Sequence, residues 1–268
     1  MNILEEIIAH KCAEVEERKS LYPVKLLEKS IYFNSQPVSL KQYLMRPDKV
    51  GIIAEIKRSS PSLGKINPYV DVERTSIGYM QAGASALSIL TDIKFFDGKN
   101  EDLTLARKFN YCPILRKDFV VDEYQIIEAK SIGADAVLLL ANILTKKECK
   151  NFTRLAHQLD LEVLLEVHTT EEVDYYQSET DVIGINNRDL KTFQVDLNHS
   201  IALASKLPKD AVKVSESGLN KAEDILFLKN EGFDGFLMGE KFMKQSRPEK
   251  ACYQFISEVK DLLNKNEN

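Results

Sequence analysis

The sequence has few of the residues that build metal centres or disulfide frameworks. Both kinds of site need cysteines or histidines at short, regular spacings. The four cysteines form no CxxC pair, and the four histidines neither follow a metal-ligand spacing nor pair with a plausible nucleophile. We expect no metal site and no disulfide, and we predict reduced thiols, most of them packed in the interior, at Cys12, Cys112, Cys149 and Cys252.

Three fingerprints of common cofactor and nucleophile sites are also missing. The chain contains no Gly-rich dinucleotide-binding motif, no Walker sequence and no GxSxG elbow. These motifs bind nicotinamide cofactors or nucleoside triphosphates, or carry a catalytic serine. An enzyme with this sequence is therefore expected to work without a cofactor.

Long apolar runs and an excess of positive charge are absent as well. No segment approaches the roughly 18 apolar residues of a membrane span, and residues 1–19 mix charged with apolar side chains, unlike a secretory signal. The formal net charge of −5 does not fit a nucleic-acid partner, because phosphate backbones need a concentrated basic face. We predict a cytoplasmic protein with no membrane or nucleic-acid partner, and any anion that it binds should be small.

What the chain does contain is an alternation of short, β-branched apolar runs with longer amphipathic segments. Hydrophobic residues make up 44% and charged residues 29%, an ordinary globular composition. Near-continuous apolar strands indicate a parallel sheet buried on both faces, and eight βα units predict an α/β protein of the (β/α)₈ or TIM-barrel type, because a doubly wound sheet normally has fewer strands. The candidate strands are residues 51–57, 86–92, 113–119, 136–142, 162–168, 182–190, 212–218 and 235–240.

Residues 1–48 lie outside this repeat and are predicted to form an N-terminal helical extension. No Gly-, Pro- or Ser-rich linker divides the chain, so we predict one barrel domain over residues 1–268, with the extension as part of it. The extension either closes one end of the barrel or contributes to substrate binding, and the sequence leaves both open.

Polar residues gather at the predicted C-terminal ends of the strands, where barrels of this class carry their active site. A carboxylate or ammonium inside an apolar barrel is costly unless paired, so several together favour an interior polar network over isolated ion pairs or rim charges. Crowded lysines and glutamates shift one another's pKa values and suit acid-base chemistry, although a lysine Schiff base remains open. The candidates are Glu55, Lys57, Lys117, Glu166, Asn186, Arg188, Glu216 and Ser217, with His168 as a rim residue.

Glycines follow the seventh and eighth strands, the usual phosphate position in such barrels. Gly218 and Gly239 would let backbone N–H groups approach an anion closely, although simple turn geometry also explains them. The polar loop KRSSPSLG at residues 57–64 begins with two cations. It is a candidate to close over a phosphorylated ligand, and the alternative is a surface loop without a role.

The order and spacing of these motifs resemble one known enzyme family. The segments IIAEIKRSSPSLG, LSILTD with FF downstream, PILRKDF, LLEVH, IGINNRDL, VSESG and LMGE, together with the opening ILEEIIAHKCAEVEERK, are similar to the signature segments of indole-3-glycerol phosphate synthases. The resemblance covers nearly the whole chain. It implies an enzyme of tryptophan biosynthesis that converts 1-(2-carboxyphenylamino)-1-deoxyribulose 5-phosphate to indole-3-glycerol phosphate with release of carbon dioxide and water.

The resemblance also implies roles for individual residues. Lys117 would be the general acid, Glu166 would transfer protons and stabilise positive charge on the anilino nitrogen, and the Glu55–Lys57 pair would assist dehydration and bind a substrate anion. The substrate would be oriented by Asn186, Arg188, Glu216 and Ser217, its phosphate held by Ser60, Gly218, Gly239 and Glu240, and its aromatic ring bordered by Phe96, Phe119, Pro61, Leu138 and Leu190.

Two other classes of function remain as alternatives. The first is another phosphosugar barrel enzyme, either an isomerase or a Schiff-base aldolase. The isomerase needs a Cys or Asp base near the first strand, where this sequence has Glu55 instead. A barrel that binds a phosphorylated metabolite without turning it over is the second. The sequence indicates a small phosphorylated molecule as the ligand and does not indicate a protein partner or an oligomeric state.

Overall fold

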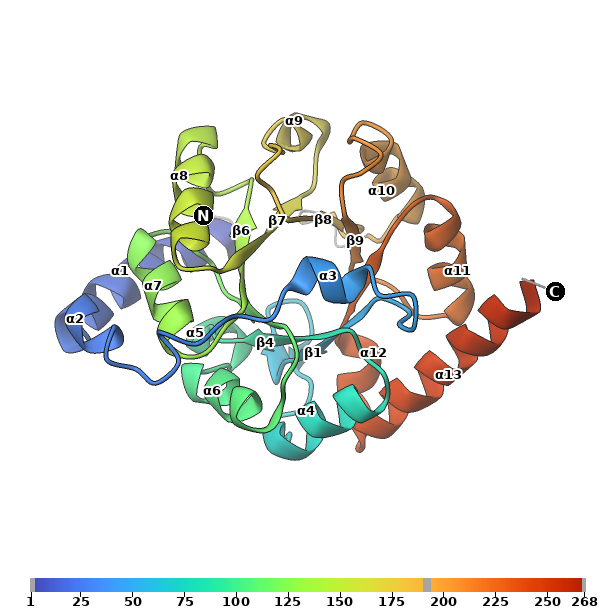
Figure 1. Cartoon of the computed structure of the whole chain (residues 1–268), viewed down its shortest axis with the longest axis horizontal. Helices are drawn as coiled ribbons and strands as arrows, with labels where there is room; N and C mark the ends of the chain where they lie inside the picture. Colours follow the sequence, from blue (N-terminus) through green and yellow to red (C-terminus); the bar gives the residue numbers. More distant parts are fainter. Residues whose placement is uncertain (1–2, 190–193, 267–268) are drawn as a thin grey trace.

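Eight parallel strands close into a barrel in this computed structural model, which describes residues 3–189 and 194–266. The strands follow one another around the ring as β1-β10-β9-β8-β7-β6-β5-β4 (Figure 1). Each lies inside one of the eight predicted ranges, so the (β/α)₈ prediction is confirmed. The strands are β1 (Ile52–Ile56), β4 (Ala86–Leu90), β5 (Ile114–Lys117), β6 (Ala136–Leu140), β7 (Glu162–Val167), β8 (Val182–Asn186), β9 (Lys213–Glu216) and β10 (Gly235–Met238).

Side chains alternate between the barrel interior and the surrounding helices, as the period of a strand requires. Ile53, Leu115, Leu164 and Leu237 belong to one fully or almost fully buried apolar cluster inside the barrel. Because successive inward positions are two residues apart, Lys117 shares the inward face of β5 with Leu115. The apolar interior therefore ends in polar side chains toward the C-terminal ends of the strands.

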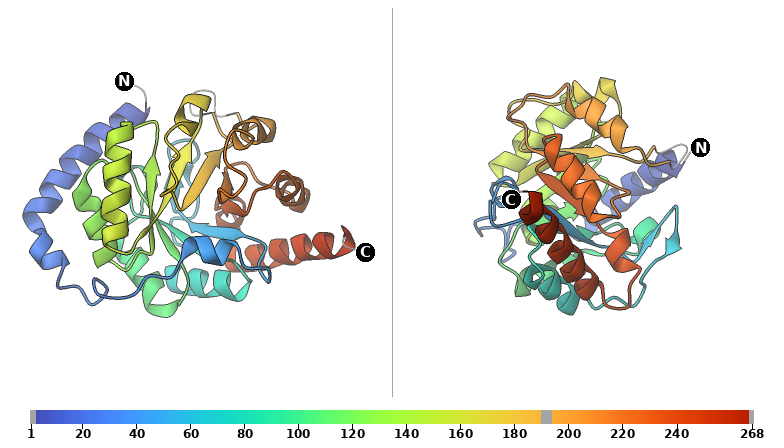
Figure 2. Two further views of the ribbon diagram at one scale, coloured as in Figure 1. Left: turned by 45° about the horizontal axis from the view of Figure 1, so that its top comes forward. Right: turned by 90° about the vertical axis from the view of Figure 1, so that its right-hand side faces the viewer.

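Helices surround the barrel and connect the strands (Figures 1 and 2). Asp122 and Thr145 are the N-cap residues of two of them and form capping boxes there, which satisfy free N–H groups of the first helical turn. The helices around the barrel are α4 (Val72–Gln81), α5 (Ile93–Phe96), α6 (Asn100–Phe109), α7 (Glu123–Ser131), α8 (Lys146–Gln158), α9 (Thr170–Val173), α10 (Leu197–Ala204), α11 (Ala222–Asn230), α12 (Glu240–Met243) and α13 (Pro248–Asn266). The polar loop after β1 contains a short hairpin of β2 (Ser59–Ser60) and β3 (Gly64–Lys65).

The N-terminal extension contains three helices, α1 (Ile3–Leu21), α2 (Val24–Leu27) and α3 (Leu40–Leu44). Leu40 and Leu44 of α3 pack into the apolar cluster inside the barrel, and α3 lies across the ring of strands in Figure 1. Ser39 Oγ donates to Glu162 Oε1 at the first residue of β7, over 2.5 Å. Helix α3 therefore closes the N-terminal end of the barrel, whereas α1 runs along its outside beside α7 (Figure 2).

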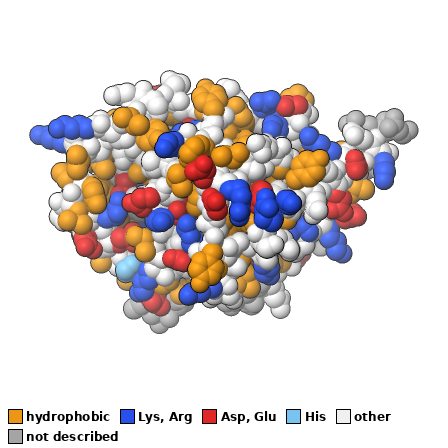
Figure 3. Space-filling view, turned by 90° about the horizontal axis from the view of Figure 1, so that it is seen from below, with side chains coloured by type: hydrophobic (Ala, Val, Ile, Leu, Met, Phe, Trp, Pro, Cys, Tyr) orange, Lys and Arg blue, Asp and Glu red, His pale blue; other side chains and the backbone are white. Residues whose placement is uncertain are grey.

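The outer surface mixes charge with apolar side chains. On the face seen in Figure 3, Lys and Arg lie beside Asp and Glu, with apolar side chains between them. Cys112, Cys149 and Cys252 are buried free thiols and Cys12 is an exposed one. Within the described ranges, no helix is both long and apolar enough to cross a membrane.

Candidate active site

The centre of the site is an ammonium held between two carboxylates at the C-terminal ends of the strands. Lys117 Nζ, from β5, donates to Glu166 Oε2 of β7 over 2.7 Å and to Glu216 Oε2 of β9 over 2.8 Å. Asn186 of β8 completes the cluster, because its Nδ2 donates to Glu166 Oε1 over 2.8 Å. The structure thus brings together four of the predicted site residues from four different strands.

Burial and mutual charge give these groups unequal pKa values. Burial alone would lower the pKa of Lys117, but the charges of Glu166, Glu216 and Glu55 outweigh it and raise this pKa well above its ordinary value. The pKa of Glu166 is lowered because the nearby Lys117 and His168 outweigh its burial. Burial and the charge of Glu166 raise the pKa of Glu216 to about 7. The site therefore holds a charged lysine, an ionised glutamate and a glutamate that titrates near neutral pH.

A second pair of opposite charges lies at the C-terminal end of β1, with Glu55 on the strand and Lys57 just after it. Lys57 Nζ is 2.7 Å from Glu55 Oε1, and the charge of Glu55 also contributes to the pKa values of Lys117 and Glu216. The pair stands two residues apart, so both side chains leave the same face of the chain. Glu55 and Lys57 therefore extend the cluster, as the sequence predicts.

Two glycines give the buried carboxylates the room they need. A Cβ on Gly184 of β8 would lie 2.2 Å from Glu216 Oε1, and a Cβ on Gly239 would lie 2.6 Å from Glu55 Oε1. Any larger residue would have to displace the carboxylate. Gly239 was predicted to bind phosphate alone, and Gly184 was not among the predicted site residues.

The loop after β9 is held in an unusual backbone conformation. Ser217 has a φ of 70° and Gly218 a φ of 73°, a left-handed region that costs free energy for a residue other than glycine. Asn187, which is buried, stabilises this loop because its Nδ2 donates to Ser217 O over 2.7 Å and to Ser215 Oγ over 2.9 Å. Asn187 was not among the predicted site residues, although it lies inside the INNRDL motif.

The loops after β8, β9 and β10 meet where the phosphate residues were predicted. Arg188 Nη2 lies 3.3 Å from Glu240 Oε2, and Lys241 Nζ donates to Asn220 O over 2.6 Å. Gly239 is the N-cap residue of α12. Asn220 Nδ2 donates in turn to Gly218 O over 2.8 Å. The adjoining loops therefore hold Arg188 and three of the four predicted phosphate residues, Gly218, Gly239 and Glu240.

Ser60, the fourth predicted phosphate residue, lies on the loop after β1. Its Oγ accepts from the N–H of Leu63 over 3.3 Å and lies 3.4 Å from Ser62 Oγ, so its described hydrogen bonds stay within the loop. Arg58 anchors the same loop to Asp102 through an ion pair. Whether Ser60 reaches a phosphate stays a prediction.

Two of the apolar side chains predicted to border an aromatic ring, Phe96 and Phe119, lie on the loops after β4 and β5. The rings of Phe96 and Phe119 are 5.9 Å apart between centroids, and both side chains are half-buried. Phe119 packs against the interior cluster that includes Leu138. Pro61 is exposed on the loop after β1, and Leu190 lies outside the described residues.

One histidine has a closer contact with the site than its expected place on the rim suggests. His168 Nε2 lies 3.1 Å from Glu166 Oε1. Burial alone would lower the pKa of His168, but the nearby carboxylate of Glu166 outweighs it and raises this pKa. The signal was present in the sequence, because His168 stands two residues after Glu166 and such positions share one face of an extended chain.

The raised pKa of Glu216 predicts how stability responds to pH. Because this pKa is about 7 rather than 4.5, the folded state binds the proton more tightly, and the stability that Glu216 contributes is lost as pH rises from 4.5 through about 7. Glu216→Gln cannot ionise, so it does not lose this stability. We expect the melting temperature of the variant minus that of the wild type to be higher at pH 8 than at pH 5. Thermal unfolding at both pH values measures this, and an equal difference at both would contradict it.

Comparisons with known proteins agree with this geometry. A profile of the family described as "Indole-3-glycerol phosphate synthase" matches residues 4–255. The indole-3-glycerol phosphate synthase of Bacteroides thetaiotaomicron is 47% identical, over 96% of this chain and 99% of the relative, and that of Caldanaerobacter subterraneus subsp. tengcongensis is 43% identical over the same shares.

Similar solved structures support the fold alone. Tryptophan synthase subunit alpha from Legionella pneumophila superposes with a TM-score of 0.61 at 13% identity, over 84% of this chain and 97% of that one. A thiamine phosphate pyrophosphorylase from Pyrococcus furiosus gives 0.59 at 16% identity, over 81% and 98%. Among the described residues no group of His, Cys, Asp and Glu has the arrangement of a metal site. The profile match and the extent of identity show that this chain belongs to the indole-3-glycerol phosphate synthase family.

Proposed function

We propose that this barrel acts as a carboxy-lyase that closes, decarboxylates and dehydrates 1-(2-carboxyphenylamino)-1-deoxyribulose 5-phosphate, with Lys117 as the general acid. The observation that carries this proposal is the ammonium of Lys117 between Glu166 and Glu216 at the C-terminal end of the barrel. A general acid must carry its proton and reach the reacting oxygen. Lys117 is protonated over the whole neutral range, because the surrounding carboxylates raise its pKa.

In the first step the ring carbon that bears the carboxylate attacks the ketone carbon of the sugar. The ketone oxygen gains negative charge and takes a proton from Lys117 Nζ, while positive charge develops on the anilino nitrogen. Glu166 is ionised, so it stabilises that positive charge electrostatically. Loss of carbon dioxide then restores the electron pair to the ring.

Dehydration removes the newly formed hydroxyl as water and one proton from the five-membered ring. Glu55 and Lys57 form an adjoining acid and base pair, 2.7 Å apart. We assign them to this step, with Lys57 also binding an anionic group of the substrate. Asn186, Glu216 and Ser217 orient the substrate hydroxyls and the two main catalytic groups.

The phosphate is assigned to the adjoining loops after β8, β9 and β10, with Ser60 from the loop after β1. Gly218 and Gly239 place backbone N–H groups there, and the first N–H groups of a helix have no partner within it. Glu240 contributes through its N–H, because its carboxylate is already paired with Arg188 and Lys244. The aromatic ring is assigned to the side of Phe96, Phe119, Pro61, Leu138 and Leu190.

The test is product formation from the pure substrate. We expect the purified protein to release one carbon dioxide for each indole-3-glycerol phosphate formed, followed by indole fluorescence and a carbonate assay. Formation of a product that keeps the carboxylate, or carbon dioxide release without an indole, would contradict the proposal.

A Schiff-base aldolase reaction is the competing use of a buried lysine. It needs a neutral amine as the nucleophile, and the raised pKa of Lys117 disfavours that form. Borohydride reduction in the presence of substrate should therefore leave the protein mass unchanged, and a covalent adduct on Lys117 would favour the aldolase.

A further inference from the structure

A lysine of the N-terminal extension is fully buried against the barrel. Lys11 of α1 has no exposed surface. Its Nζ lies 2.9 Å from Asp92 Oδ2, 3.0 Å from Asp118 Oδ1 and 3.0 Å from Glu14 Oε2. Lysines are almost never fully buried unless they are paired, because removing an ammonium from water is costly. The three carboxylates outweigh the effect of burial and raise the pKa of Lys11, so the group stays charged.

The two barrel carboxylates that face Lys11 each fix a loop of the candidate site. Asp118 Oδ1 also accepts from the N–H of Phe119 over 2.8 Å. Asp92 Oδ1 accepts from the N–H of Phe95 over 2.8 Å and so caps α5, the short helix that ends in Phe96. One ammonium therefore joins the loop after β4 to the loop after β5.

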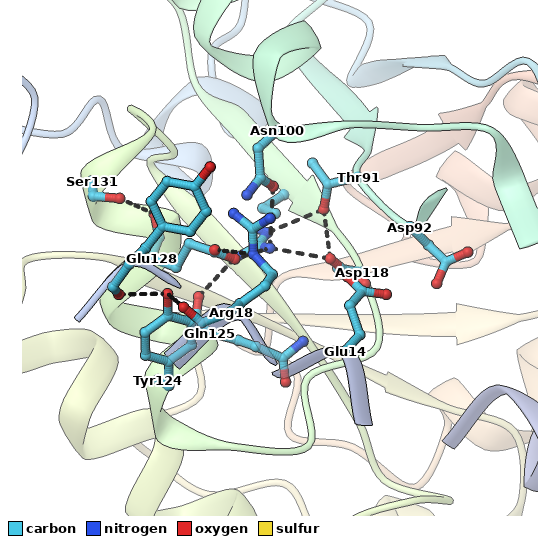
Figure 4. A network of polar contacts seen from close by, with 12 residues as sticks. Glu14, Arg18, Thr91, Asp92, Asn100, Asp118, Tyr124, Gln125, Glu128 and Ser131 are labelled. Atoms are coloured by element: carbon cyan, nitrogen blue, oxygen red, sulfur yellow. Dashed lines mark hydrogen bonds and ion pairs between the residues drawn. The ribbon is translucent and has the colours of Figure 1, made fainter. Parts of the chain in front are cut away.

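Asp118 is held from the outer side of the barrel as well. Its Oδ2 accepts from Thr91 Oγ1 over 2.6 Å and from Arg116 Nη2 over 3.2 Å, and Figure 4 shows Thr91, Asp92 and Asp118 close together. Because Lys117 stands between Arg116 and Asp118, its side chain leaves the opposite face of the strand, into the barrel. The contacts of Asp118 thus fix the backbone on both sides of the proposed general acid.

We propose that Lys11 is a positioning residue: its ammonium holds the loops after β4 and β5 together, so that Phe96 and Phe119 form one wall for the substrate's aromatic ring. This inference rests on the proposed roles of Phe96, Phe119 and Lys117. The ion pairs of Lys11 go to Glu14, Asp92 and Asp118, none of which is among the predicted site residues. Asp92 Oδ2 is buried, and in the described part of the chain its one polar contact is the ammonium of Lys11. Loss of Lys11 would therefore leave the charge of Asp92 uncompensated between the two loops.

Contacts other than those of Lys11 also dock the N-terminal extension onto the barrel. Arg18 Nε donates to Glu128 Oε1 over 2.5 Å, and Lys19 Nζ donates to Asp122 Oδ2 over 2.7 Å. Tyr124 Oη donates to Tyr22 O over 2.8 Å. These contacts reach α7 and its N-cap Asp122, at the α7 end of the loop after β5. None of the three reaches the loop after β4, so none joins the two phenylalanine loops, and Figure 4 shows Arg18 beside Glu128.

The experiment compares Lys11→Met with Lys19→Met, a matched control that removes a lysine contact of the same helix. Binding is measured by calorimetry for two probes: the substrate analogue in which the ketone is reduced to an alcohol, and ribitol 5-phosphate, which lacks the aromatic ring. We expect Lys11→Met to weaken binding of the ring-bearing analogue by about tenfold or more, since small displacements in a site are costly. We expect kcat/KM to fall by a similar factor. The ring-free phosphate should bind unchanged, and Lys19→Met should match the wild type for both probes.

Equal behaviour of the two variants would overturn the proposal and reduce Lys11 to an anchor of α1. A loss of affinity for both probes would also overturn it, because it would mean general disruption of the site. If Lys11→Met does not fold, Asp92→Asn removes the ion pair between Lys11 and the loop after β4 and should show the same selective loss of affinity. The absence of such a loss in Asp92→Asn would count against the proposal. Failure of the wild type to turn over the substrate would instead contradict the proposed function.

Discussion

Replacing Lys117 with methionine should lower kcat by roughly 10³ to 10⁴, the upper range for losing a general acid. Methionine is also unbranched and of similar volume, although one atom shorter, and it has no proton to donate. Glu166 and Glu216 would then face each other without the ammonium that now lies 2.7 and 2.8 Å from them, so one of them would take up a proton near neutral pH. Indole fluorescence with saturating substrate measures the effect.

The control for this variant is the loss of another buried lysine. Lys213, at the start of β9, is buried and its Nζ donates to Ala211 O over 2.8 Å, away from the site carboxylates. We expect Lys213→Met to keep kcat within a few-fold of the wild type while it lowers stability. A Lys117→Met protein that is folded and turns over at a comparable rate would show that another group supplies the proton.

Replacing Gly184 with alanine should lower kcat by about 10²-fold, because the added Cβ would lie 2.2 Å from Glu216 Oε1 and 2.7 Å from Leu164 Cδ2. Leu164 is fully buried, so the carboxylate has to move, and a displacement of about 1 Å in a catalytic site costs about this much. Overpacking of the interior should also lower the free energy of unfolding by about 1–3 kcal/mol. Steady-state kinetics and denaturant unfolding measure the two effects.

Gly235→Ala provides the matched control at the opposite end of the barrel. Its Cβ would lie 2.9 Å from Val214 Cγ2 and 3.0 Å from Leu44 Cδ2, which are apolar residues of the interior cluster and not site carboxylates. We expect a similar loss of stability with nearly unchanged kcat below the melting temperature. If both variants lose activity in parallel, the effect of Gly184→Ala comes from overpacking in general and not from Glu216.

The strands and the central cluster were predictable because each depends on local pattern and one topological rule. Eight apolar runs gave the barrel, and the rule that active sites lie at the C-terminal ends of the strands selected Lys117, Glu166 and Glu216 before their distances were known. The alternation of side chains also explains why Arg116 and Asp118 face outward while Lys117 faces inward.

The remaining contacts join segments that no local pattern connects. Lys11 meets Asp92 and Asp118 from a distance of about eighty to over one hundred residues along the chain, and nothing in an amphipathic helix distinguishes a buried lysine from an exposed one. Gly184 is similar, because a glycine in a strand indicates a close approach but not which side chain approaches. Such partners become visible only when the strands are placed side by side.

The most direct measurement of the central claim uses one preparation of the wild-type protein for both binding and turnover. Calorimetry with the reduced substrate analogue reports whether the site is formed, and indole fluorescence with the true substrate reports whether the protein performs the ring closure and decarboxylation. We predict that the analogue binds and that indole-3-glycerol phosphate appears with multiple turnovers. A folded protein that binds the analogue but forms no indole product would contradict it and would favour a barrel that binds a phosphorylated metabolite without catalysis.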